Sequence, residues 1–453
     1  MKLKYNALLL AVISAIQLTG CGGGGSNNSA PTPNVETRPT PTIESTTLAP
    51  LTIKTIKKNQ CNSAPISADV VFHDGSGAFV SSFKTNSSGQ LDTGIPENAR
   101  HASFILKTTD NQNVLHTQIQ TVLNIQNGFE VDALVFNDPN TCGCSDIIYN
   151  LETLSAQIPN THLHNAVAPH VNLGNGQVEV YACVPEQQRL LYTHSVAGYK
   201  GGLFDTSEPS TLMLSDEQFT ATGTPLDLSI FSFEPNYYIN LTSYVNNEAV
   251  YNVTVNETEI DQPFEQSHDR LVTFSDLATV NYLSTSKSDE RYTGNGYIKT
   301  HSYALSRLDN QGNSVQVQHF DSTQSFDNVL DFFIQTVTDE SDNIVLDLKS
   351  AHDRLDALIF SSTWSDVNHG NSSWHVFSDG QDIIPDLSFG HIIPRESLSL
   401  NDVSVEILLL DLNTDQNFDD MRELYFESAE SFQKSLDSKL FDGMASYSFA
   451  TYE

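Results

Sequence analysis

The chain has 453 residues, which corresponds to roughly two to four domains of ordinary size. It carries 22 Lys and Arg against 56 Asp and Glu, a formal net charge of −34 at pH 7, and this balance argues against a nucleic-acid-binding protein, which needs a basic face. The same charge argues against electrostatic adhesion to anionic lipid. Hydrophobic residues make up 39% of the chain, which is enough to form cores.

Residues 1–20 have the features of a targeting segment. Lys2 and Lys4 precede an uncharged apolar run over residues 7–16. A run of this length is too short to cross a hydrocarbon core about 30 Å thick. It therefore indicates a signal peptide rather than a membrane anchor.

The end of this segment, Leu18-Thr19-Gly20-Cys21, resembles the lipobox of bacterial lipoproteins. In that family the Cys thiol takes a diacylglycerol and cleavage makes the Cys the new N-terminus, so the resemblance assigns lipidation to Cys21. The next residue is Gly22 rather than the Asp that retains such proteins in the inner membrane. The resemblance thus implies a protein anchored in the outer membrane of a Gram-negative cell by its acyl chains. Whether the body lies at the surface or in the periplasm is left open.

Residues 21–50 are predicted to be a disordered tether. Four glycines follow Cys21, and the remainder is rich in Pro, Thr, Ser and Asn. Such a composition cannot bury a core and favours an extended, solvated backbone.

Residues 51–143 consist of short alternating segments separated by turns. Turn residues that recur about every eight to twelve positions are typical of a β-sandwich. The pattern strand–DGSG–strand–NSSG–strand resembles immunoglobulin-like modules of the carboxypeptidase-regulatory type, which implies a β-sandwich that acts as a spacer or binding platform. The strands of this β-meander are expected at residues 68–73, 78–85 and 90–95, with turns at 74–77 and 86–89.

Residues 144–264 and 265–453 are expected to form two further β-rich domains, so that the fold class is all-β, with tandem sandwiches and very little helix. The abundance of Val, Thr, Tyr and Phe supports this class. Strand-like runs are found at residues 177–183, 190–196, 225–232, 237–244, 249–255 and 403–410.

Four cysteines remain after Cys21. In an oxidising compartment an even number favours disulfides. Cys142 and Cys144 are too close in sequence to pair comfortably, so one bridge is expected from Cys61 to either of them and another from the other to Cys183. A metal site on the Cys142-Gly143-Cys144 segment is the less favoured alternative.

An acidic segment near the C-terminus resembles the calcium loop of EF-hand-like sites. Oxygen-bearing side chains alternate along a loop that follows a strand-like run, and calcium prefers six to eight oxygen ligands. Two departures, Gln416 at the turn position and Arg422 at the last ligand position, favour an ordinary acidic turn instead. If calcium binds, the ligands are expected to be Asp411, Asn413, Asp415, Asn417, Asp419 and Glu423.

Both tryptophans, Trp364 and Trp374, flank a polar loop. Aromatic rings beside amides often contact sugars, which makes them candidate ligand-binding residues, although core packing is the commoner role. The sequence contains no assembled catalytic set, so an enzyme is the less favoured interpretation.

These features predict a lipid-anchored envelope or cell-surface protein with a non-enzymatic structural, adhesive or partner-binding role. Acidic lipoproteins of similar build occur in sheathed flagella, an association by analogy only. The alternative is an envelope hydrolase or a glycan-binding protein with a site built from loops. The expected partners are the membrane, through the N-terminal lipid, and a protein or glycan ligand.

Overall fold

The protein is described here from a computed structural model. The described residues are 50–59, 63–125, 129–140, 144–157, 161–165, 170–174, 176–183, 190–194, 199–202, 212–226, 238–245, 248–256, 271–277, 280–292, 297–309, 319, 355–366, 368–380, 384–394, 401–412, 418–421 and 443–452. Of the described part, 63% is strand and 6% is helix, which confirms the all-β class. The predicted signal peptide and nearly all of the tether lie outside it.

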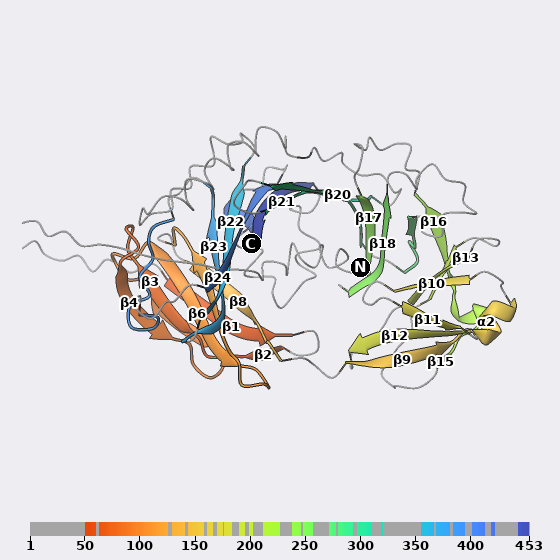
Figure 1. Ribbon diagram of the computed structural model, residues 1–453, viewed down its shortest axis with the longest axis horizontal. Helices are drawn as coiled ribbons and strands as arrows, with labels where there is room; N and C mark the ends of the chain where they lie inside the picture. Colours follow the sequence, from red (N-terminus) through yellow and green to blue (C-terminus); the bar gives the residue numbers. More distant parts are fainter. Residues whose placement is uncertain are drawn as a thin grey trace, which may run out of the picture.

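Within the described residues, one long sheet of twelve strands runs through much of the molecule (Figure 1). Its order is β18-β17-β20-β21-β25-β24-β22-β23-β7-β6-β3-β4. The strands from the N-terminal part are β3 (Asp69–His73), β4 (Phe79–Lys84), β6 (His101–Thr109) and β7 (Leu115–Val122). The others are β17 (Tyr238–Val245), β18 (Glu248–Asn256), β20 (Val280–Tyr292), β21 (Tyr297–Arg307), β22 (Ala357–Asp366), β23 (Gly370–Ser378), β24 (Asn401–Asp411) and β25 (Met444–Tyr452).

The long sheet joins strands that are distant in sequence. β23 pairs with β7 in parallel, from Asn371 opposite His116 to Phe377 opposite Val122. Strands of the predicted domains 51–143 and 265–453 therefore share one hydrogen-bonded sheet. The exact boundaries of the three predicted β domains stay predictions.

A second, smaller sheet packs against the part of the long sheet that contains the N-terminal strands β3, β6 and β7, and the two sheets form a sandwich-like arrangement. It contains β1 (Pro50–Lys58), β2 (Ser63–Pro65), β5 (Gln90–Gly94) and β8 (Phe129–Asn137). The face of the long sheet turned toward it is called the inner face. The shared core includes Leu51, Ile53 and Phe136 of the small sheet with Phe104 and Phe377 of the long sheet.

The predicted meander is correct in its strands and turns but wrong in its pairing. β3 and β4 pair, and Asp74 and Asn86 each accept backbone N–H bonds through Oδ1 within the two turns. β5, however, pairs with β1 in the other sheet and not with β4. The chain crosses between the sheets at Gly89, whose φ of +73° and close approach to the Thr55 backbone leave no room for a side chain.

Part of the opposite, outer face of the long sheet, over β3, β6, β7 and β22, is covered by the chain after β23. Leu387, Phe389 and Ile393 pack against a cluster that includes Ile105 and Trp364. The backbone of Ser388 also donates a hydrogen bond to Gly77 O at 2.9 Å, which ties this segment to the β3–β4 turn.

The part of the chain between β8 and β20 supplies two smaller sheets (Figure 1). One contains β10 (Thr161–Asn165), β13 (Leu190–His194), β14 (Tyr199–Gly201), β16 (Ala221–Pro225) and β19 (Val272–Thr273). The other contains β9 (Cys144–Asn150), β11 (His170–Gly174), β12 (Gln177–Cys183) and β15 (Leu212–Met213). Two short helices, α2 (Glu152–Gln157) and η1 (Asp216–Gln218), accompany them.

Candidate functional site

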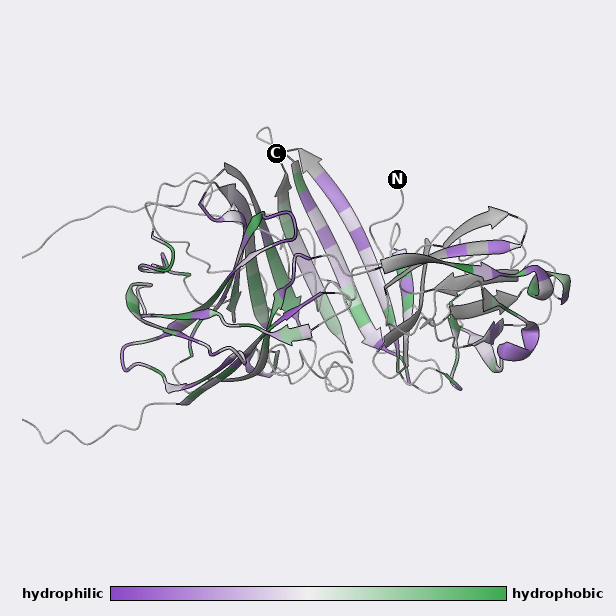
Figure 2. Cartoon of the chain, turned by 90° about the horizontal axis from the view of Figure 1, so that it is seen from below, coloured by the Kyte–Doolittle hydropathy of each residue, from purple (hydrophilic) through white to green (hydrophobic). Residues whose placement is uncertain are grey.

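The inner face of the long sheet changes from apolar to polar along its strands. On β21, Tyr303 and Leu305 belong to the core, whereas His301 and Lys299 continue the same face two residues apart. In Figure 2 the long strands beside the C-terminus are correspondingly green toward one end and purple toward the other. The polar end is the candidate site because buried sheet faces are ordinarily apolar.

Strand register places a row of polar residues across this end, here called the polar row. Successive pairing partners across β20, β21, β25, β24, β22, β23 and β7 bring the residues into line although they are far apart in sequence. The polar row consists of Glu290, Lys299, Glu406, Ser361, His375 and Gln120, and the apolar Ala450 of β25 lies between Lys299 and Glu406.

The middle of the polar row is a buried group of titratable side chains. Ser361 Oγ lies 2.9 Å from His375 Nδ1, and the two side chains are only 5% and 4% exposed. Burial lowers the pKa of His375 to about 4, so its imidazole is neutral at pH 7. Burial raises the pKa of Glu406 to about 7, against a hydrogen bond from Ser448 that favours the carboxylate.

The order of this group differs from that of a Ser–His–acid triad. In a triad the imidazole lies between the serine and the carboxylate, which orients it. Here Ser361 is the register partner of both Glu406 and His375 and lies between them. The arrangement therefore lacks the relay that activates a serine.

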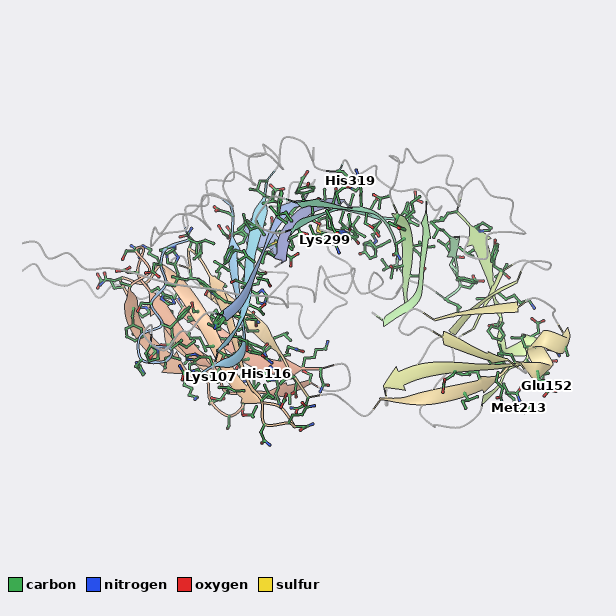
Figure 3. All side chains as sticks on the ribbon, in the orientation of Figure 1. Lys107, His116, Glu152, Met213, Lys299 and His319 are labelled. Atoms are coloured by element: carbon green, nitrogen blue, oxygen red, sulfur yellow. The ribbon has the colours of Figure 1, made fainter. Side chains whose placement is uncertain are left out.

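The accessible part of the inner face lies on β17, β20 and β21. Ser288 Oγ is 2.7 Å from His301 Nδ1, and burial, with a contribution from the positive charge of Lys299, lowers the pKa of His301 to about 4. Glu290 is exposed, and Tyr238 on β17 is 50% exposed. Figure 3 shows Lys299 on the underside of the arch formed by β20 and β21.

The other side of the same arch carries a separate histidine. His319 lies above the arch in Figure 3, and its Nε2 and Nδ1 lie 2.6 Å from Thr285 Oγ1 and 2.9 Å from Ser302 Oγ. Both faces of β20 and β21 thus carry a histidine bonded to a hydroxyl group. Lys287 and Asp289 form an ion pair at 3.2 Å on the outer face, whereas Glu290 and Lys299 are register partners on the inner face.

The polar residues of β7 at the end of the row have a structural role. Gln120 Nε2 donates to Val135 O at 2.7 Å. Gln118 donates to Asn137 O at 2.6 Å and accepts the Asn137 N–H at 2.8 Å. These amides satisfy backbone groups of β8 and so join the two sheets of the sandwich-like part.

The predicted calcium ligands are only partly described. Asp411 ends β24 and is 3% exposed, and Asp419 is exposed in a helical turn at residues 418–421. The side chain of Asp356 meets the start of this loop, because its Oδ2 accepts the Leu412 N–H at 2.9 Å. Among the described residues, no three His, Cys, Asp or Glu side chains are placed to hold a metal. The remaining predicted ligands, Asn413, Asp415, Asn417 and Glu423, lie outside the described part.

The two tryptophans are placed in the sheet. Trp364 is 5% exposed within the outer-face core, and Trp374 is partly buried with its ring edge-on to Phe389. Trp374 Nε1 donates a hydrogen bond to Thr121 Oγ1 at 2.9 Å, and the Thr121 hydroxyl is also hydrogen-bonded to Ser103 Oγ at 2.7 Å. These contacts give both rings packing roles, and their role in ligand binding stays a prediction.

The cysteines are placed only in part. Cys144 and Cys183 belong to β9 and β12, while Cys21, Cys61 and Cys142 lie outside the described residues. No disulfide is found among the side chains that the structure describes.

Sequence reasoning missed the polar row. No motif links Ser361, His375 and Glu406, since they reach one another only through strand pairing. The available signal was local: the inner-face positions change from apolar to polar along each strand, from Ile359 to Ser361 on β22 and from Leu408 to Glu406 on β24.

The fold is that of an all-β protein built from sandwich-like sheets, and its candidate site is the polar row on the inner face of the long sheet. No family model matches the chain, and no curated protein matches it. Among solved structures, the native conformation of E. coli alpha-2-macroglobulin aligns at 9% identity with a TM-score of 0.11. That alignment covers 77% of this chain and 26% of the other, and a TM-score this low carries no argument.

Proposed function

We propose that this is a lipid-anchored envelope protein with a non-enzymatic role, and that it binds a protein partner through the polar inner face of β17, β20 and β21. The observation that carries the proposal is the accessible polar surface on a sheet face that is elsewhere buried core. Exposed Tyr238 and charged Glu290 and Lys299 give this surface both apolar and charged contacts.

The long sheet supports this role mechanically. Its hydrogen-bonded strands connect the surface on β17, β20 and β21 to the sandwich-like part at the N-terminal end. The tether precedes that part directly, because β1 begins at Pro50. A partner held on the inner face would therefore be linked to the predicted anchor through the long sheet and the smaller sheet packed against it, in which β1 lies.

The lipobox carries the membrane part of the proposal. Among the described residues, no helix combines the length and apolar character needed to cross a bilayer. The resemblance of Leu18-Thr19-Gly20-Cys21 to a lipobox is the reason to assign attachment to acyl chains on Cys21. Each buried CH₂ of such a chain contributes about 0.8 kcal/mol to anchoring.

The anchor is tested by fractionation of cells that produce the wild type or Cys21→Ser. We expect the wild type to sediment with outer membranes and the variant to be released. Continued sedimentation of the variant would refute the lipid assignment. Protease treatment of intact cells, with a periplasmic control protein, then determines which side of the membrane carries the body.

The binding face is tested by photo-crosslinking in the producing cell. A photoreactive residue in place of Tyr238 is expected to give a discrete crosslinked species. The matched control is Asp289, which is exposed on the outer face of β20. Equal crosslinking from both positions, or none from Tyr238, would contradict the proposed surface. A charge reversal, Lys299→Glu, should weaken the specific crosslink.

A second candidate function, glycan binding, is favoured by Tyr238 alone. Its ring is half exposed on the same face as Asn240, and an aromatic ring beside an amide can stack on a sugar. Sedimentation with purified peptidoglycan or lipopolysaccharide tests this function. Tyr238→Ala should abolish cosedimentation and Tyr238→Phe should retain it.

A further inference from the structure

The pairing of β9 with β12 brings two cysteines together. The strands are antiparallel and in continuous register from Asn150 opposite Gln177 to Cys144 opposite Cys183. The two cysteines are far apart in the sequence, but they form the last pair of this ladder.

We propose that Cys144 and Cys183 form a disulfide that closes this end of the β9–β12 pair. Residues directly opposite each other in an antiparallel pair have Cα atoms about 4.5 or 5.5 Å apart, depending on the type of pair. Disulfides require Cα separations of about 4.4–6.8 Å. Directly opposite positions also share one face of the sheet, so both types of pair meet the requirement.

The register thereby selects between the two connectivities that the sequence leaves open. With Cys144 paired to Cys183, the remaining partners are Cys61 and Cys142, which lie outside the described residues. The described chain leading to each of them agrees with this pairing. β1 and β8 run in parallel, and Asn59 Nδ2 donates to Asn140 O at 3.1 Å, two residues before the respective cysteines.

The chemistry is a thiol–disulfide exchange with an external disulfide. One cysteine thiolate attacks the disulfide of a thiol–disulfide oxidoreductase or of oxidised glutathione, and a mixed disulfide forms. The second thiolate displaces the carrier thiol, so that two protons and two electrons leave the protein and the carrier is reduced to two thiols. In the cell this step rests on the proposed envelope location, which is oxidising.

The inference is tested on purified protein, so that its failure is separate from a failure of the proposed location. All variants carry Cys21→Ser. The first, Cys61→Ser with Cys142→Ser, retains Cys144 and Cys183. The control, Cys61→Ser with Cys144→Ser, retains Cys142 and Cys183. After incubation with oxidised glutathione, we expect the first variant to become a monomer that is lighter by two hydrogens and carries no glutathione. The control is expected to keep free thiols or glutathione adducts without an internal bridge. Closure of the control at the same rate, or two free thiols in the first variant, would overturn the proposal.

A single substitution gives a second test in case the double variants do not fold. In oxidised Cys144→Ser, the alkylated free thiol is expected at Cys183. A free thiol at Cys61 would establish the other connectivity, and alkylation of all the remaining cysteines would show that no bridge forms. Tryptic peptides resolve this assignment, because Lys84 and Arg100 separate Cys61 from Cys183.

Discussion

The joint between β7 and β23 makes a quantitative prediction for Ile119→Ala. Ile119 is 1% exposed and lies on β7 opposite Trp374 of β23 and Ile105 of β6. It belongs to the same core cluster as Trp364. Ile119 falls in the predicted first domain, whereas both tryptophans fall in the predicted third.

The expected loss of stability follows from the size of the deletion. The substitution removes three buried carbon atoms, each worth about 0.8 kcal/mol of transfer free energy, which gives about 2.4 kcal/mol. A cavity term adds to this, because the neighbouring strands are held by the sheet and can relax only in part. The total expected for such a deletion is about 2–5 kcal/mol.

The assay is urea unfolding followed by intrinsic fluorescence. The chain has two tryptophans, and both lie in the strands next to the joint, β22 and β23. We expect Ile119→Ala to lower the unfolding midpoint at this signal. The conservative Ile119→Val should lower it less, by the equivalent of about 0.5–1.5 kcal/mol.

An unchanged fluorescence midpoint in a folded Ile119→Ala variant would refute the reasoning. It would mean that the tryptophan-bearing strands unfold independently of β7. The alternative of separate domains over residues 51–143 and 265–453 would then be favoured.

Three further predictions concern a turn, a carboxyl group and a metal. Gly370→Ala should destabilise the β22–β23 hairpin by at least about 1–2 kcal/mol, measured by thermal unfolding, because φ is +66° and a Cβ would lie 1.9 Å from Leu115 O. For Glu406, whose pKa is raised to about 7, the folded state keeps a proton that the unfolded chain releases near its ordinary pKa of 4.5, so this group makes stability fall as pH rises between these values. Glu406→Gln should remove that fall, and equal wild-type and variant slopes from pH 5 to 7 would contradict the assignment. Calcium should raise the melting temperature, and Asp415→Ala should abolish the rise. A melting temperature that EDTA does not change would contradict the predicted calcium site.

Local sequence determined much of the secondary structure. Alternating apolar residues predicted strands at 177–183 and 403–410, and the structure has β12 at Gln177–Cys183 and β24 at Asn401–Asp411. The turns at Asp74 and Asn86 were also predictable from the sequence, since their side chains accept hydrogen bonds from backbone groups within four residues. These features depend on neighbours in the chain, which is why the sequence displays them.

Strand pairing was decided by the tertiary structure. The departure of β5 from β4 to β1, and the parallel pairing of β7 with β23, join segments that no local pattern connects. A strand exposes hydrogen-bonding groups on both edges, and those groups are the same for every sequence. The partner is selected by which apolar faces can be buried together.

The functional residues also fall into two groups: those that the sequence predicts and those that only the folded structure brings together. Sequence alone identified Cys21 as the predicted lipidation site, because a lipobox is read along a continuous segment. The row that contains Ser361, His375 and Glu406 appears only when three strands are in register. The pKa values of His375 and Glu406 are likewise set by burial, which depends on the folded sheet and on no residue adjacent to them in the chain.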